Sequence, residues 1–197
     1  MTKTSPKIIA LSGSSRDKSW NKKLVGIAAD GARSAGAEVT NINLADFPMP
    51  LYNGDIEEKQ GLPSAAQEIK SLMIKCDGFL IASPEYNGGY SALLKNAIDW
   101  ISRPVAGEQR LRAFAGKKAV IMSASPGALG GVRGLTQLRQ ILTNIQILVL
   151  PDQASIPGAH NAFKDDGALS EESQHQRVFD LGVKLTLLVQ KLDGAKS

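Results

Sequence analysis

The sequence contains a single cysteine, Cys76, so no disulfide can form within its 197 residues. Structural disulfides belong to oxidising compartments, and their exclusion favours a reducing one. No apolar run approaches the ~20 residues that a membrane-spanning helix needs. The first apolar run, Ile8–Leu11, is too short for a secretory signal. We therefore expect a cytoplasmic protein that does not associate with a membrane.

Histidine is also scarce, and the two histidines, His160 and His175, lie in or near an acidic segment late in the chain. Isolated histidines in such a setting are more often solvated surface residues than catalysts. No cluster of His, Cys, Asp and Glu has the spacing of a metal site, so we expect no metal. Cys76 follows the apolar Met73 and Ile74, which favours an inert core thiol over a redox thiol.

The formal net charge of +4 could indicate a nucleic-acid partner, but the basic residues are spread over the whole chain. They form only short pairs such as Lys22-Lys23, and acidic pairs such as Glu57-Glu58 interrupt any basic stripe. A mildly basic surface suits anionic small molecules at least as well. We expect no nucleic-acid partner.

Short apolar or β-branched runs alternate with amphipathic segments, which predicts a parallel sheet with helices on both faces in one domain, residues 1–197. The predicted strands are Ile8–Leu11, Glu38–Leu44, Gly78–Ser83, Lys117–Ser125 and Ile145–Leu150. The predicted helices are Asn21–Ala35, Ser64–Cys76, Ser91–Ser102, Leu135–Thr143 and Glu171–Leu192. Two strand orders remain open at this point, the flavodoxin-like one and a truncated Rossmann one, and both bind ligands beyond the carboxyl ends of the strands.

The loop after the first strand, "GSSRDKSWN" (Gly13–Asn21), offers hydroxyls, Arg16 and the start of a helix. A helix N-terminus favours an anion, and an arginine can bind phosphate in bidentate fashion. The loop has neither the Walker pattern nor the GxGxxG glycines, which speaks against a nucleoside triphosphatase and a dinucleotide fingerprint. The competing interpretation is an ordinary helix start, with Ser19 as its N-cap.

The loops after the third and fourth strands add a platform and a rim. In "PEYNGG" (Pro84–Gly89) the glycines allow close approach of a flat ligand, Tyr86 can pack on it, and Asn87 tolerates unusual turn geometry. The alternative interpretation of this loop is a surface turn that binds no ligand. "SASPGALGGVRG" (Ser123–Gly134) can expose several amides, which stabilise negative charge. Together the three loops suit a flat heterocycle that carries a phosphate.

These motifs resemble those of the NADPH-dependent FMN reductase family. "GSSRDKSWN" is similar to its phosphate loop GSxRxxSxN, "PEYNGGYSALLKNAIDW" to its flavin platform, and "SPGALGG" to its third flavin-contacting loop. The resemblance covers nearly the whole chain and implies a flavodoxin-like, three-layer α/β/α fold with a five-stranded parallel sheet in the order 2-1-3-4-5. It implies that the FMN phosphate is held by Ser14, Arg16, Ser19 and Asn21, with the backbone of Trp20. It places Pro84, Glu85, Tyr86 and Asn87 along the isoalloxazine ring, and Ser125 and Gly127 at its pyrimidine side.

The resemblance also implies an activity. NADPH or NADH would supply two electrons by ping-pong hydride transfer to quinones, flavins or similar acceptors, with chromate, azo and nitro compounds among the candidates. The chemistry would take place on FMN, in the environment of Glu85, Tyr86 and Asn87, without a catalytic side chain of the protein. Amides near Glu85–Asn87 would orient the ring and those near Ser125–Gly127 would stabilise its negative charge.

Three alternatives remain open at this stage. The first is a flavodoxin-type FMN electron carrier that does not oxidise nicotinamides itself. The second is a phosphate-ester or nucleotide-binding protein without flavin, and the third is a reductase that supplies free reduced flavin to a partner monooxygenase. Family members commonly form homodimers or homotetramers, and the helix Ala92–Ile101 has apolar residues and Trp100 to spare. We therefore expect a homo-oligomer.

The segment Phe47–Pro63 is predicted as a long loop. Loops of this length are often functional, so it could cover the site or reach a neighbouring subunit. A simple surface excursion is an equal alternative.

Overall fold

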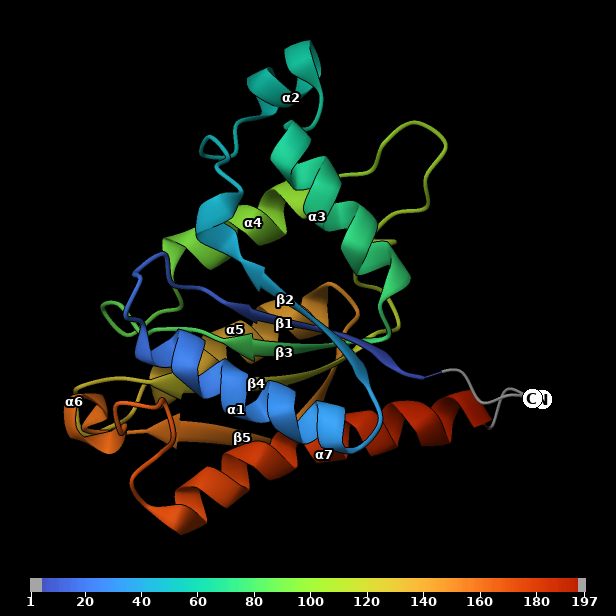
Figure 1. Cartoon of the computed structure of the whole chain (residues 1–197). Coiled ribbons are helices and arrows are strands. Elements are labelled where there is room, and N and C mark those ends of the chain that lie inside the picture. The colour runs from blue at the N-terminus through green and yellow to red at the C-terminus, as the bar shows by residue number, and fades with distance from the viewer. Residues whose placement is uncertain (1–4, 195–197) are drawn as a thin grey trace.

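The computed structural model describes residues 5–194 and has five parallel strands at its centre (Figure 1). The strands are β1 (Lys7–Ser12), β2 (Glu38–Asn43), β3 (Gly78–Ala82), β4 (Lys118–Ala124) and β5 (Leu148–Ile156). They pair in the order β2-β1-β3-β4-β5, and every pairing is parallel. The predicted flavodoxin-like order 2-1-3-4-5 is confirmed.

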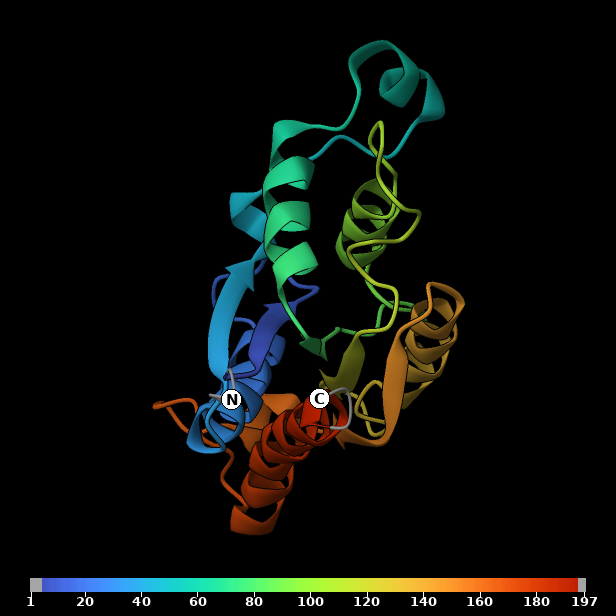
Figure 2. The same ribbon diagram turned by 90° about the vertical axis from the view of Figure 1, so that its right-hand side faces the viewer.

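Helices cover both faces of the sheet, so the molecule has three layers (Figure 2). One face carries α1 (Trp20–Ser34) and α7 (Glu172–Gly194), and the other carries α3 (Ser64–Lys75), α4 (Ala92–Ile101) and α5 (Val132–Asn144). The shorter helices are the 3-10 turn η1 (Leu44–Asp46), α2 (Gly54–Gln60) and α6 (Ala159–Ala162). Among the helices of the described residues, none combines the length and apolarity that a bilayer crossing requires.

The strand sequences explain the two cores. Side chains alternate between the faces of a strand, so a strand covered on both faces must be apolar throughout. In β3, Phe79 and Ile81 pack with α3, α4 and α5, whereas Leu80 and Ala82 pack on the side of α1 and α7. This explains why a continuous apolar run, rather than an alternating one, indicates the central strands.

The structure corrects the bounds of the last strand and the helix before it. The strand predicted at Ile145–Leu150 runs from Leu148 to Ile156, and it continues through Pro151 at a register shift against β4. Proline is tolerated there because β5 is an edge strand. Helix α5 begins at Val132, three residues before the predicted Leu135, because Gly131 supplies a left-handed N-cap residue with φ of 89°.

The segment 47–63 contains α2, so its prediction as a plain loop is wrong. Asn53 caps α2 by accepting a hydrogen bond from the amide of Asp55 at 2.8 Å. The preceding chain is fastened to α4: Pro50 O accepts from Trp100 Nε1 at 2.7 Å and from Asn96 Nδ2 at 2.9 Å. No residue of α2 is buried, and Figure 1 shows the helix projecting from the α3 and α4 side of the molecule.

Candidate functional site

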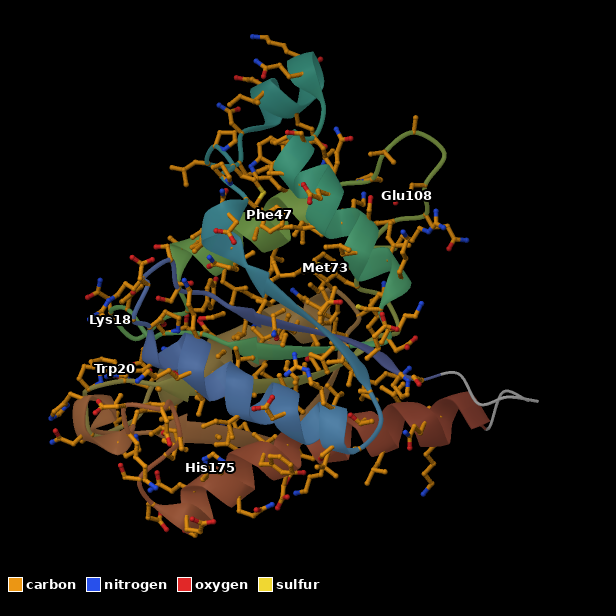
Figure 3. All side chains as sticks on the ribbon, in the orientation of Figure 1. Lys18, Trp20, Phe47, Met73, Glu108 and His175 are labelled. Carbon is orange, nitrogen blue, oxygen red and sulfur yellow. The ribbon has the colours of Figure 1, made fainter. Side chains whose placement is uncertain are left out.

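The loops that follow β1, β3 and β4 meet at the carboxyl edge of the sheet and line one pocket. Lys18 and Trp20 mark this end of the molecule in Figure 3. The pocket is lined by Ser14, Arg16, Ser19, Trp20, Asn21, Pro84, Glu85, Tyr86, Ala124, Ser125 and Pro126. The structure thus brings together all the predicted binding residues except Asn87 and Gly127, which lie outside this lining. Ala124 and Pro126 line the pocket without having been predicted.

Two buried serines shape the first loop. Ser14 Oγ accepts a hydrogen bond from the amide of Arg16, and Ser19 Oγ accepts one from the amide of Lys22, each at 3.4 Å. Ser19 is therefore the N-cap of α1. Each hydroxyl keeps its own hydrogen, because a serine can accept and donate at once. Capping the helix and binding an anion are compatible roles for Ser19.

Arg16 gives this part of the pocket its positive charge. Its side chain is exposed, its guanidinium lies 5.5 Å from the centre of the Trp20 ring, and it forms no ion pair with any carboxylate of residues 5–194. The first turn of α1 contains no acidic residue, so the partial positive charge of the helix N-terminus is not neutralised there. The loop is electrostatically suited to a phosphate.

Asn21 joins the first loop to the third. Its side chain is buried; Oδ1 accepts from the amide of Ala124 at 3.0 Å, and Nδ2 donates to the carbonyl of Ala124 at 2.9 Å. The resemblance assigns Asn21 to the phosphate. In the structure both polar atoms of its amide bind the end of β4, so it fixes the two loops relative to each other.

The second loop closes with a tight two-residue turn. Tyr86 and Gly89 exchange both backbone hydrogen bonds, at 2.9 and 3.0 Å, and the intervening Asn87 and Gly88 have φ of 52° and 80°. Positive φ at both central positions is the requirement of a type I′ turn, and Asn-Gly is its preferred sequence. The expected turn role of Asn87 is confirmed. The turn leaves Tyr86 54% exposed at the pocket.

Glu85 lines the pocket, and its carboxylate binds the N-terminal end of α5. Its carboxylate accepts hydrogen bonds from Arg133 Nε and Nη2 at 2.9 and 2.6 Å, and from the amide of Gly134 at 2.9 Å. Burial alone would raise the pKa of Glu85, but the Gly134 amide and the Arg133 guanidinium outweigh it and hold the pKa below its ordinary value. Glu85 is therefore a carboxylate at the N-terminus of α5. Arg133 lies within the third loop motif, Ser123–Gly134, but was assigned no role from the sequence.

The third loop uses several of its amides internally. The amide of Ser125 donates to Ile156 O at 3.1 Å, Pro126 has none, and the amide of Gly127 donates to Ser125 Oγ at 3.3 Å. The Gly127 bond is longer than the Ser125 bond, so of these two amides a ligand can recruit that of Gly127 more easily. Fewer amides between Ser125 and Gly127 are thus free to bind a ligand than the composition of the loop suggested.

The two histidines and the cysteine lie outside the pocket lining. His175, on α7 in Figure 3, accepts a hydrogen bond from the amide of Leu169 at 3.3 Å. Cys76 is buried, and burial raises its pKa to about 12, which keeps the thiol uncharged. Within residues 5–194, no three His, Cys, Asp or Glu side chains gather in a way that could hold a metal ion.

A second, wider groove lies between β5 and α7, away from the loops. Its charged side chains are engaged with their neighbours: Lys184 pairs with Asp152 at 2.7 Å, and Arg177 donates to Gln153 O at 3.0 Å. The pocket at the carboxyl edge is smaller, but it alone of the two combines an unpaired cation, among the described residues, with an exposed aromatic side chain.

A parallel sheet in the order 2-1-3-4-5, with helices on both faces and a pocket at the carboxyl ends of its strands, defines a flavodoxin-like fold. Residues 6–161 match the model of the family described as NADPH-dependent FMN reductase. The chain is 34% identical over 194 residues to an NAD(P)H-dependent FMN reductase of Pseudomonas aeruginosa, covering 95% of this chain and 97% of that one. It is 32% identical to an NAD(P)H:quinone oxidoreductase of Solanum tuberosum, with 95% of each covered.

Solved structures agree. FerB, a flavoenzyme NAD(P)H:(acceptor) oxidoreductase from Paracoccus denitrificans, superimposes with a TM-score of 0.78 at 25% identity, over 94% of this chain and 98% of its own. The protein belongs to the NADPH-dependent FMN reductase family, as the motifs predicted. Membership implies FMN as the cofactor and NADPH or NADH as the electron donor.

Proposed function

We propose that this protein, as one FMN-binding domain of residues 1–197, transfers two electrons from NADPH or NADH to a quinone or a flavin. The observation that carries the proposal is the convergence of the predicted loop residues on one pocket, with Arg16 at its first loop and Tyr86 at its second. The pocket offers a cation to a phosphate and an aromatic side chain to a flat ring, and FMN has both a phosphate and a flat ring.

Each part of the pocket has a separate role in this proposal. Ser14, Arg16 and Ser19 hold the phosphate, because they offer hydroxyl hydrogens and an exposed cation beside a helix N-terminus. Pro84 and Tyr86 border the ring, and Ser125 lies at its pyrimidine side. Bound FMN supplies the redox chemistry, as a hydride acceptor and a two-electron donor. The residues of the protein bind FMN and orient its ring.

We propose a mode of turnover that the exposure of Tyr86 in the second loop supports. Tyr86 is more than half exposed, so nicotinamide and acceptor are proposed to occupy the same open side in turn, which gives ping-pong kinetics. Chromate, azo and nitro compounds are further candidate acceptors. We also propose that the protein acts in the cytoplasm as a homodimer or homotetramer; a 20.9 kDa species alone in size-exclusion chromatography would exclude the oligomer.

The proposal is tested anaerobically. The protein is reconstituted with FMN, NADPH or NADH is added, and bleaching of the flavin absorbance is followed before addition of a benzoquinone. Rapid bleaching and full two-electron reoxidation are expected. A flavin that stays bound but is reduced by neither nicotinamide would favour the electron carrier, and a protein that remains colourless after reconstitution would exclude the flavin site.

Arg16→Ala is expected to weaken FMN binding by about 1.5–3 kcal/mol, the range of a hydrogen bond to a charged group. The side chain is exposed, so its loss should leave the fold intact. FMN affinity is measured by titration of flavin fluorescence. Lys18→Ala is the matched control, because it removes the same charge from an exposed position of the same loop. Equal, small losses of FMN affinity in the two variants would show that Arg16 contributes only to the overall positive charge of the loop and forms no specific bond to FMN.

A further inference from the structure

The first two turns of α5 contact the second loop along one helical face. Arg133 and Gly134 bind the carboxylate of Glu85, and Gln137 Nε2 donates to Gly88 O at 3.0 Å. We call Arg133, Gly134 and Gln137 the α5 clamp. Arg133 and Gly134 are the last two residues of the third loop motif, Ser123–Gly134, whereas Gln137 lies beyond it, and none of the three lines the pocket.

The clamp binds the exposed turn at two points along the chain. Glu85 immediately precedes Tyr86, and Gly88 follows it by two residues, so the two points of attachment flank Tyr86 in the sequence. Gly134 permits this close approach: a Cβ at that position would lie 3.1 Å from Gly89 O and 3.4 Å from Glu85 Cγ. A larger residue would push the turn away from α5.

The ion pair within the clamp is well placed to resist movement. The Glu85 side chain is only 7% exposed, whereas that of Arg133 is 63% exposed, so the carboxylate is sheltered and the guanidinium covers it. One carboxylate oxygen accepts two bonds from the planar guanidinium and the other accepts the helix amide. Charge-assisted bonds of this kind are stronger and more directional than neutral ones.

We propose that Arg133 and Gln137 are positioning residues that fix the Tyr86 turn against α5 and thereby set both the affinity for FMN and the reduction potential of the bound flavin. This inference rests on the proposed placement of the flavin ring at Pro84 and Tyr86. The backbone dipoles of the turn act on the ring from a fixed position, and such preorganised dipoles determine how well charge on a ligand is stabilised. A turn released from α5 loses that fixed position.

The test compares Arg133→Ala, Gln137→Ala and Arg133→Lys with the unaltered protein. Arg133→Ala is expected to weaken FMN binding by about tenfold, the equivalent of one charged contact, and Gln137→Ala by a few-fold. Both should shift the midpoint potential of the bound flavin, and Arg133→Lys should restore part of the affinity. Gln140→Ala, on an exposed position of the same helix, is the matched control and should change neither quantity.

A double variant asks whether Arg133 acts through Glu85. If it does, Arg133→Ala should change FMN affinity and potential far less in the Glu85→Gln background than in the unaltered protein, since contacting residues are non-additive. Thermal unfolding of each FMN-free variant separates a positioning role from lost stability. Should Arg133→Ala fail to fold, Gln137→Ala and Arg133→Lys carry the same comparison.

The outcomes distinguish this inference from the proposed function. Unaltered protein that binds no FMN would refute the proposed function. Unaltered protein that binds FMN, together with variants whose dissociation constant and potential both equal those of Gln140→Ala, would refute only the positioning role of the clamp.

Discussion

Replacing Trp100 with alanine is expected to lower the free energy of unfolding by about 3–5 kcal/mol, the usual cost of removing a buried aromatic side chain. Trp100 has 0% exposure and is the largest of the fully buried side chains. Its Nε1 donates to Pro50 O at 2.7 Å, and Tyr52 packs edge-on against its ring at 5.0 Å between centroids. Since domains are stable by only about 5–15 kcal/mol, this loss removes much of the total.

Two further variants separate packing from anchoring. Trp100→Phe keeps an aromatic ring but loses the bond to Pro50 O, which still accepts from Asn96; a cost of about 1 kcal/mol, typical of one hydrogen bond, is expected beyond the lost ring volume. Leu51→Ala alters a side chain that is 78% exposed and should change stability by about 0.5 kcal/mol at most.

Urea titration measures the three stabilities, and limited proteolysis tests whether the segment 47–63 is released. We expect Trp100→Ala to be cleaved in that segment first, because the segment loses the hydrogen bond from Trp100 and the contact of Tyr52 with the Trp100 ring, and keeps, of its hydrogen bonds with α4, those with Asn96. If Trp100→Ala were no less stable than Leu51→Ala, the interpretation of Trp100 as the anchor of this segment would be wrong.

The sheet was predictable because each central strand is marked by its own residues, without reference to residues distant in the sequence. Phe79–Ala82 is apolar without interruption, and only a strand buried on both faces requires that. The edge strand β5 was misplaced for the opposite reason. Proline and aspartate are depleted in strands, and β5 continues past Pro151 and Asp152 because its residues from Gln153 onward pair with β4. Pairing with β4 is a tertiary contact, and a single sequence does not display it.

The same division holds for the candidate site. The loop after β1 and the Asn-Gly turn are local structures, so their residues could be named from the sequence. The joints between the loops are not local: Glu85 and Arg133 are 48 residues apart, and Asn21 and Ala124 are 103 apart. Neither pair has a spacing that indicates contact, and both become visible only when the strands are placed side by side.

The close crossing of α1 and α7 depends on a pair of glycines, and this leads to the second large expected effect. A Cβ at Gly31 of α1 would lie 1.9 Å from Phe179 O, and a Cβ at Gly182 of α7 would lie 1.8 Å from Ala28 O. Both obstacles are backbone atoms, which cannot turn aside as a flexible side chain can. Alanine at either position must therefore separate the two helices.

We expect Gly31→Ala and Gly182→Ala each to lower the free energy of unfolding by about 1–3 kcal/mol or more, the range for overpacking a core. Gly26→Ala, also in α1, is the matched control, because nothing lies within 4 Å of its added Cβ. It should stabilise the protein by about 0.5–1 kcal/mol through helix propensity.

The double variant of Gly31 and Gly182 tests the crossing itself. Once the first alanine has moved the helices apart, the second meets more space, so the combined loss of stability should be smaller than the sum of the two single losses. Thermal or urea unfolding of the four proteins provides the comparison. Strictly additive losses would show that the two glycines act independently and not through a shared helix crossing. A stabilising Gly31→Ala would mean that α1 and α7 do not approach as closely as the contact between Gly31 and Phe179 requires.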